Sequence, residues 1–413
     1  MSNKKVLIFC FSFPPYPGTG GRRWAKFAKY LAHVGYEVFV ISAKNYSVKD
    51  SDWKKDVKGK GISVFDLHSF YPQASNKLPN RIFHFLFSKP IQWFTNRNYL
   101  DPSIYWARSA VRLAGELIRK EGIMNVIATA PPFGYLTSVA DLKNVYPQIN
   151  LILDVRDSHS YTLKALSDKV RSTELNAGSI ATSGFNSIIT VADEMSDEYI
   201  KLSRNGQGVV TIHNGFDRAD FDLPEFPVSE PNPEKIRFIY AGNLIEECSP
   251  YALAFFKILL EFREHKSSLY DKIVVDIFGN REPTLQDFCT SNDLKNVHFH
   301  GRVIHAQIIK EIACSDFCLI FPADFYYKFS LETKFFEYCY MRKPIVTFPE
   351  SGICSDLVNS NKLGIALPLT GSAGRMESFL DDYISRKFVY NTAFDIDKYN
   401  VRHLTEQLTV LLK

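Results

Sequence analysis

The stretch VLIFCFSFPPYPGTGGRRWAKFAKYLAHVG (residues 6–35) decides the fold class, because it joins an apolar run to a helical pattern through a short loop. Residues 6–13 are typical of a buried strand, and Gly35 ends the predicted helix. The apolar positions of that helix are Trp24, Phe27, Ala28 and Leu31. Strand, loop and helix in this order predict the first half of a βαβ unit.

The composition of the loop between this strand and helix indicates a ligand-binding loop. Its glycines let the backbone come close to a bound group, and the helix N-terminus offers free N–H groups. Arg22 and Arg23 add positive charge, which suits a phosphate or a polyhydroxylated group. The glycines at 18, 20 and 21 do not follow the GxGxxG spacing, so a nicotinamide site is poorly supported. A tight turn with surface arginines remains the alternative.

The alternation of strands and helices runs through two halves of the chain. In the first half, strands are predicted at 37–43, 62–67, 125–130, 151–155, 187–192 and 209–215, with a helix at 111–122. The proline-rich and acidic stretch 221–235 predicts a linker. In the second half, strands are predicted at 237–244, 272–280, 297–301, 316–322 and 344–349, and helices at 249–265, 305–315 and 331–342.

This pattern predicts an α/β protein with two Rossmann-like domains. We place the first at 1–222 and the second at 235–392, with the final helix at 397–413 returning to the first domain. Ligands of parallel α/β sheets bind at the carboxyl ends of the strands. The architecture therefore favours an enzyme of two substrates with its site in a cleft between the domains.

Composition excludes some classes of function. The 413-residue chain has a net charge of only +4, too weak alone to argue for nucleic acid. Its seven cysteines form no CxxC pair, which favours reduced, buried thiols over a zinc site. No apolar run approaches the roughly 20 residues that span a bilayer. We therefore expect a cytoplasmic protein.

A group of polar and charged residues lies at the end of the buried strand at 151–155. They are Asp154, Arg156, Asp157 and His159, and the mouth of a parallel sheet is where chemistry takes place. An Arg–Asp pair that only braces the loop is the alternative, and the two interpretations are compatible.

The segment SLETKFFEYCYMRKPIV carries a second candidate site. Lys334 and Glu337 lie three residues apart on one helix face, with Ser330 near the helix start. A carboxylate there can accept hydrogen bonds from ribose hydroxyls, and free N–H groups can hold a diphosphate. The alternative is a surface ion pair worth less than about 1 kcal/mol.

The segment 77–97 interleaves aromatic and aliphatic residues with lysine and arginine. Such a segment can lie against anionic lipid, which predicts peripheral contact with the inner face of the membrane. Packing of these aromatic residues into the domain core is an equal alternative.

Several motifs, in order, resemble one family over essentially the whole chain. They are residues 13–42, LDPSIYWARSA, VIATAPPFGYLTSVA, LDVRDS, NGFDRADF, IYAGNL, FHGRV and ETKFFEYCYMRKPIV. Together they resemble the retaining GT-B glycosyltransferases of family 4, in particular a bacterial subgroup that works on surface polysaccharides such as capsule and lipopolysaccharide.

The resemblance implies donor-binding roles for several residues. Glu337 matches the second glutamate of the family's paired-glutamate motif, which holds the donor ribose, whereas Phe329 replaces the first. Asn243 stands where many members have an arginine for the diphosphate, and Glu332 replaces a usual proline. The remaining implied donor contacts are Lys334, the backbone of Ser330 and Leu331, Arg302 near the base, and Gly20.

The same resemblance implies roles for the first half. Arg156 falls near the family's catalytic-region histidine, beside Asp157, and Gly21 belongs to the loop that faces the reacting groups. On the acceptor side we place Arg22, Arg23 and His159.

The leading hypothesis is therefore a metal-independent glycosyltransferase without a cofactor, and the resemblance implies that it is retaining. It would move a sugar from a UDP- or GDP-sugar to a glycan or polyprenyl-linked acceptor. A nucleotide-sugar 2-epimerase of the same fold and a non-catalytic scaffold for glycan assembly are the alternatives.

Overall fold

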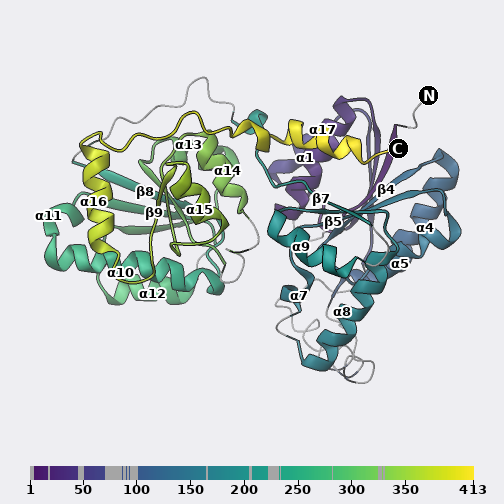
Figure 1. Ribbon diagram of the computed structural model, residues 1–413, viewed down its shortest axis with the longest axis horizontal. Helices are drawn as coiled ribbons and strands as arrows, with labels where there is room; N and C mark the ends of the chain where they lie inside the picture. Colours follow the sequence, from purple (N-terminus) through teal and green to yellow (C-terminus); the bar gives the residue numbers. More distant parts are fainter. Residues whose placement is uncertain are drawn as a thin grey trace. The chain divides into compact units, whose positions relative to one another are not determined.

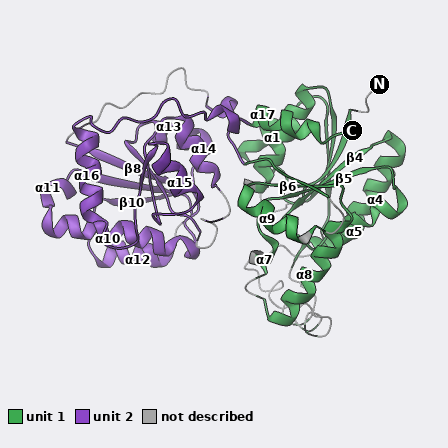
Figure 2. Cartoon of the chain, in the orientation of Figure 1, with its two compact units in different colours: residues 1–213, 401–413 green, residues 214–400 purple. Residues whose placement is uncertain are grey.

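The computed structural model contains two compact units. Residues 1–213 and 401–413 form unit 1, and residues 214–400 form unit 2 (Figure 2). The structure describes residues 4–16, 19–44, 51–69, 101–163, 166–203, 207–221, 234–280, 282–323 and 331–413, with the isolated positions 86, 90, 93, 232 and 328. The sequence places domain limits at 222 and 235, whereas the units divide between His213 and Asn214.

Unit 1 is built on a seven-stranded sheet of order β3-β2-β1-β4-β5-β6-β7 (Figure 1). Each neighbouring pair of strands is parallel. The strands are β1 Lys5–Phe9, β2 Glu37–Ala43, β3 Ile62–Leu67, β4 Asn125–Ala130, β5 Asn150–Val155, β6 Ser187–Thr190 and β7 Gly208–Thr211. The buried central strands are almost entirely apolar, as expected for a sheet covered on both faces.

Two helical layers cover this sheet. The helices are α1 Thr19–His33, η1 Asp52–Val57, α4 Ser103–Glu121, α5 Leu136–Ala140, α6 Leu142–Val145, α7 His159–Thr162, α8 Asp168–Ser183, α9 Asp193–Leu202 and α17 Val401–Val410. Helices α4 and α5 pack on one face and α1 and α17 on the other, as Figure 1 shows.

The C-terminal helix belongs to unit 1, as the sequence predicts. It is shorter than the predicted 397–413, because a 3-10 turn, η6 Asp397–Tyr399, precedes it. Side-chain amides hold the end of the chain: Asn150 Nδ2 donates to Leu411 O at 2.8 Å, and Asn125 bonds both main-chain groups of Lys413.

Unit 2 has a six-stranded parallel sheet of order β10-β9-β8-β11-β12-β13. Its strands are β8 Ile236–Ala241, β9 Ile273–Phe278, β10 Val297–Gly301, β11 Phe317–Ile320, β12 Ile345–Thr347 and β13 Gly364–Ala366. Its helices are η3 Arg218–Asp220, η4 Glu246–Cys248, α10 Ser249–His265, α11 Ser267–Tyr270, α12 Pro283–Ser291, α13 His305–Ala313, α14 Thr333–Tyr340, α15 Ile353–Ser360 and α16 Ala373–Ile384. Two apolar clusters fill the faces of this sheet.

The predicted α/β class with two parallel-sheet domains is confirmed. Six of the seven cysteines are buried thiols as expected, but Cys314 is exposed. No helix in the described part of the chain combines the length and apolar character needed to cross a membrane. Residues 224–231 of the predicted linker, and the segment 77–97 apart from three isolated positions, lie outside the described residues.

Candidate functional site

In unit 1, Arg156 lies directly against the first turn of α1. A Cβ atom added to Gly20 would come 1.9 Å from Arg156 Nη1, so glycine makes room for the guanidinium. Arg156 follows β5 and donates from Nη2 to Pro131 O at 2.6 Å and from Nε to Thr129 Oγ1 at 3.2 Å. A fixed cation at the N-terminus of a helix is a favourable place for an anion.

Gly21 packs against a different part of unit 1. Its added Cβ would lie 2.4 Å from Ser12 O, so this glycine lets α1 pack on the backbone of the preceding loop. The structure therefore supplies a packing reason for Gly21, and its predicted catalytic role stays a prediction.

Arg22 and Arg23 are buried, with only 7% and 8% of their surfaces exposed. Arg23 donates to Asp154 Oδ1 and to two main-chain carbonyls after β7, at 2.7–2.9 Å. The guanidinium of Arg22 lies 4.5 Å from the ring centre of Trp53. The alternative interpretation of this loop, a tight turn with surface arginines, is therefore wrong. The predicted acceptor contact of both residues stays a prediction.

Asp154 is the centre of a polar cluster beneath the site. It is fully buried and accepts hydrogen bonds from Trp24 Nε1 at 2.8 Å and Thr129 Oγ1 at 3.2 Å, besides its ion pair with Arg23. The sequence offers an Arg–Asp pair that braces this loop as an alternative. The bracing arginine is Arg23, which reaches Asp154 from α1.

His159 packs inside unit 1 at the start of α7. Only 6% of its surface is exposed, and its ring stacks on Phe133 with 4.2 Å between centroids. Gly178 of α8 lies so close that a Cβ there would approach the imidazole to 2.4 Å. Burial lowers the pKa of His159 to about 4, so the ring is neutral at pH 7. Burial also raises the pKa of Asp157, against the opposing charge of Arg156.

Asp101, which the sequence reasoning missed, holds the loop beside Arg156. Its Oδ2 accepts from the backbone N–H groups of Phe133 and Gly134 at 3.0 and 2.8 Å, and its Oδ1 accepts from Ser103 N at 2.8 Å. Burial raises the pKa of this carboxyl group, although the hydrogen bonds oppose the shift. The Asp-Pro-Ser sequence just before α4 is the turn signal that could have revealed it.

In unit 2, Lys334 places an ammonium group beside the carboxyl end of β8. Its Nζ lies 2.9 Å from the position of a Cβ on Gly242, 4.0 Å from the ring centre of Tyr240 and 2.7 Å from Glu332 Oε2. Burial opposes the charge most strongly, but Glu332, Tyr240 and Tyr338 together outweigh it and raise the pKa of Lys334 well above its ordinary value. Lys334 is therefore a permanent cation at the start of α14.

The backbone around this cation is tightly packed. Gly279 has a φ of +124°, and a Cβ on it would come 1.8 Å from Gly242 O. Gly242 N donates to Phe278 O at 2.9 Å, and Tyr240 Oη donates to Asn243 O at 3.1 Å. These contacts fix the turn after β8 on which Lys334 rests.

Glu337 is buried on α14, with 5% of its surface exposed. Its Oε1 lies 2.9 Å from Nε2 of His305, the first residue of α13. The alternative of a solvent-exposed Lys334–Glu337 pair is wrong, because each residue pairs with a different partner. The sequence reasoning missed His305, which no local motif marks.

The other predicted donor contacts are spread over the same unit. Asn243 and Arg302 are exposed, at the ends of β8 and β10, whereas Leu331 is buried in the apolar cluster around α14. Ser330 and Phe329 lie outside the described residues.

No protein-family model matches the chain, and no curated protein matches it in sequence. Solved structures do match it. Sucrose-phosphate synthase from Thermosynechococcus elongatus aligns with a TM-score of 0.70 at 11% identity, covering 98% of both chains. Anabaena HepE in complex with UDP-glucose aligns with a TM-score of 0.66 at 15% identity over 99% of both chains.

A third similar structure is WaaG, a glycosyltransferase involved in lipopolysaccharide biosynthesis. It aligns with a TM-score of 0.64 at 12% identity over 99% of both chains. Likeness at this level of identity establishes the fold alone. The chain therefore has the two-domain GT-B fold that the sequence predicts.

Proposed function

We propose that the protein is a glycosyltransferase that moves a sugar from a nucleotide-sugar donor to a glycan or lipid-linked acceptor in polysaccharide biosynthesis. The GT-B fold supports this proposal, as do the UDP-glucose complex of HepE and the lipopolysaccharide role of WaaG. The lipopolysaccharide outer core galactosyltransferase WaaB is also similar, with a TM-score of 0.60.

The observation that carries the proposal is the permanent cation Lys334 at the carboxyl edge of the unit 2 sheet. Its ammonium group lies against Gly242 at the end of β8, next to the first turn of α14. Negative charge develops on the leaving diphosphate during transfer, and a fixed cation with helix N–H groups stabilises it. This arrangement supports a metal-independent mechanism.

The neighbouring pair Glu337 and His305 supports nucleotide binding. Buried carboxylates need hydrogen-bond partners, and His305 supplies one from the start of α13. We assign the ribose hydroxyls to Glu337, by its match to the family's paired-glutamate motif. The retaining outcome is assigned by the same resemblance.

Arg156 is our candidate for the reacting centre on unit 1. Its guanidinium is held by Pro131 O and Thr129 Oγ1, and its place beside Gly20 adds the positive end of α1. We propose that it stabilises charge on the donor phosphate or the attacking acceptor. The burial of His159 and its depressed pKa make it a packing residue rather than a proton carrier at pH 7.

Calorimetry with UDP-glucose and GDP-mannose tests the donor site. Lys334→Met should weaken the bound nucleotide sugar by about 10- to 100-fold, the effect of losing a charge-assisted hydrogen bond of about 1.5–3 kcal/mol. Lys257→Met on the exposed side of α10 is the control, because it removes the same charge elsewhere in unit 2. Equal affinities for wild type and Lys334→Met would refute the assignment.

Product analysis separates transfer from the alternatives. A transferase releases free UDP or GDP only as the acceptor is glycosylated, whereas a 2-epimerase converts UDP-N-acetylglucosamine without an acceptor. A scaffold would consume no donor. Turnover without any acceptor to a 2-epimer would replace the proposed function.

A further inference from the structure

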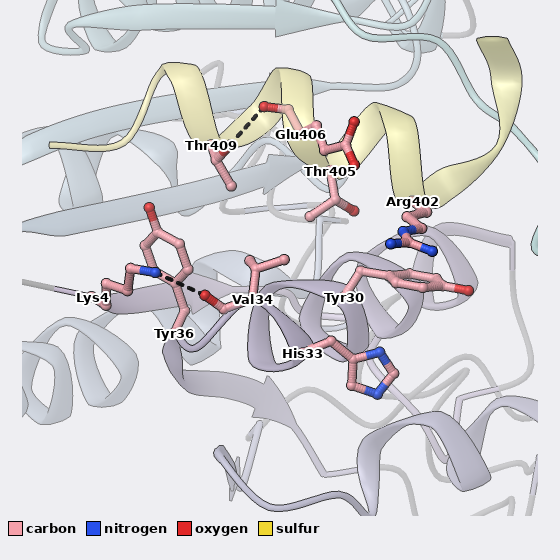
Figure 3. A pocket seen from close by; sticks show the side chains of 9 residues that line it. All are labelled: Lys4, Tyr30, His33, Val34, Tyr36, Arg402, Thr405, Glu406 and Thr409. Atoms are coloured by element: carbon pink, nitrogen blue, oxygen red, sulfur yellow. Dashed lines mark hydrogen bonds between the residues drawn. The ribbon is translucent and has the colours of Figure 1, made fainter.

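Unit 1 contains a cavity that none of the unit 1 residues described above lines. It has a volume of about 530 Å³ and lies between the C-terminal end of α1 and α17 (Figure 3). Lys4, which precedes β1, forms part of its wall, and α1 ends there at His33. These positions belong to the amino edge of the sheet. Arg156 follows the carboxyl end of β5, so the cavity and the candidate reacting centre lie at opposite edges of one sheet.

The wall of the cavity combines aromatic rings with charged groups. Tyr30 and Tyr36 contribute two partly exposed rings. Arg402 of α17 projects toward Tyr30 from the other side, as Figure 3 shows, and Glu406 of α17 also lines the cavity. Lys4 adds a second basic side chain, so the wall holds a lysine and an arginine against one carboxylate.

This combination fits one kind of ligand. A pyranose ring offers an apolar C–H face for an aromatic ring and hydroxyl groups for charged side chains. The guanidinium of Arg402 is a planar fork that matches a carboxylate. Because cations outnumber acids in this wall, a saccharide with a negative substituent fits better than a neutral one. The volume lies in the usual range for small-ligand sites.

The cavity is preformed. Leu404 and Leu408 of α17 are buried in the apolar cluster with α1, and Asn125 and Asn150 hold the last residues of the chain. Lys4 Nζ donates to Val34 O at 2.9 Å, which joins the start of β1 to the end of α1. Walls fixed in this way lose little freedom when a ligand enters.

We propose that this cavity is a second saccharide site that binds an acidic sugar unit of the glycan on which the enzyme acts. It would hold the acceptor or product chain on unit 1 at a distance from the reacting end. The choice of a glycan as ligand rests on the proposed function, whereas the cavity and its charge do not.

Calorimetry on the full chain with tetragalacturonate tests the inference, with neutral maltotetraose and inorganic phosphate as the other probes. Tetragalacturonate should bind saturably and more tightly than either. Arg402→Gln should weaken it about tenfold or more, the loss expected for one charge-assisted hydrogen bond. Arg112→Gln, an exposed arginine on α4, is the matched control and should bind as wild type. Tyr30→Leu should also weaken binding, because the stacking ring is lost.

Three results would overturn the inference: no binding of tetragalacturonate, unchanged affinity in Arg402→Gln, or equally tight binding of phosphate alone. Binding of UDP-glucose to the same proteins separates this failure from failure of the proposed function. Arg402→Gln should leave UDP-glucose affinity unchanged, since the donor contacts are assigned to unit 2. Tetragalacturonate binding without any nucleotide-sugar binding would support the cavity and refute the donor assignment.

Discussion

Replacing Gly20 by alanine should displace Arg156 without disturbing the backbone. The added Cβ would lie 1.9 Å from Arg156 Nη1 and 2.6 Å from Cζ, so the guanidinium has to leave its place. It would then lose its hydrogen bonds to Pro131 O and Thr129 Oγ1. The backbone conformation of α1 should not change, because alanine is well tolerated in a helix.

The size of the effect follows from these contacts. A hydrogen bond from a charged group contributes about 1.5–3 kcal/mol, but Arg156 is partly exposed and water replaces some of the loss, so we take about 1 kcal/mol for each bond. The change from glycine to alanine in a helix stabilises by up to about 1 kcal/mol. Gly20→Ala should therefore cost about 1 kcal/mol in the wild type. In an Arg156→Ala background it should cost nothing or stabilise by up to about 1 kcal/mol, which gives a coupling free energy of about 1–2 kcal/mol.

Tryptophan fluorescence in urea can measure this cycle in unit 1. All four tryptophans of the chain, residues 24, 53, 93 and 106, belong to that unit, so their signal follows its unfolding. Gly21→Ala is the control, because its Cβ would meet the backbone oxygen of Ser12 and should destabilise both backgrounds equally. A cost for Gly20→Ala that is the same with and without Arg156 would refute the reasoning.

Three further substitutions test the cluster beneath the site, the buried histidine and the cation of unit 2. Asp154→Ala should reduce the free energy of unfolding of unit 1 by about 3 kcal/mol, because it leaves the buried charge of Arg23 without its carboxylate, and a loss under about 1 kcal/mol would contradict this. The pKa of His159 is about 4 in the folded protein and 6.5 in the unfolded chain. Between these pH values the unfolded state binds more protons, so the free energy of unfolding falls by on the order of 3 kcal/mol as the pH decreases from 6.5 to 4. His159→Phe should remove that part of the pH dependence of urea unfolding, and an unchanged slope would count against it. Gly242→Ala should push away Lys334 and weaken UDP-glucose binding about tenfold in calorimetry, whereas Gly374→Ala, with no atom within 4 Å of its Cβ, should have no effect.

Apart from β13, Gly364–Ala366, the strands of both sheets could be predicted, because they are short, continuous apolar runs. The predicted limits 37–43, 62–67, 125–130 and 297–301 match β2, β3, β4 and β10 residue for residue. Helix α8 was not predicted, because its sequence, DKVRSTELNAGSIATS, has no sustained apolar stripe. Its place is set by tertiary contacts such as the approach of Gly178 to His159.

The chemistry of the candidate site could be predicted only in part, because sequence position does not reveal long-range partners. Arg23 pairs with Asp154 across 131 residues of chain, so the loop arginines that look available for a ligand are occupied inside the unit. Local spacing suggested that Lys334 would face Glu337. The structure pairs Glu337 instead with His305, 32 residues away.

The two units place a cation by the same means. In each, a glycine beyond the carboxyl end of the first strand has no Cβ, and a basic side chain from a distant element fills the space: Arg156 beside Gly20 in the first turn of α1, and Lys334 beside Gly242 directly after β8. Neither glycine has a positive φ, in contrast to Gly279. Their requirement is therefore space for the cation rather than backbone freedom. Alanine at either position is therefore a selective probe, since it displaces the end of a charged side chain while the backbone conformation remains allowed. The displacement should be larger for Arg156, whose Nη1 would lie 1.9 Å from the new Cβ, than for Lys334, whose Nζ would lie 2.9 Å from it. Under the proposed function both alanine variants should lose turnover, but only Gly242→Ala should lose nucleotide affinity, because the donor contacts are assigned to unit 2.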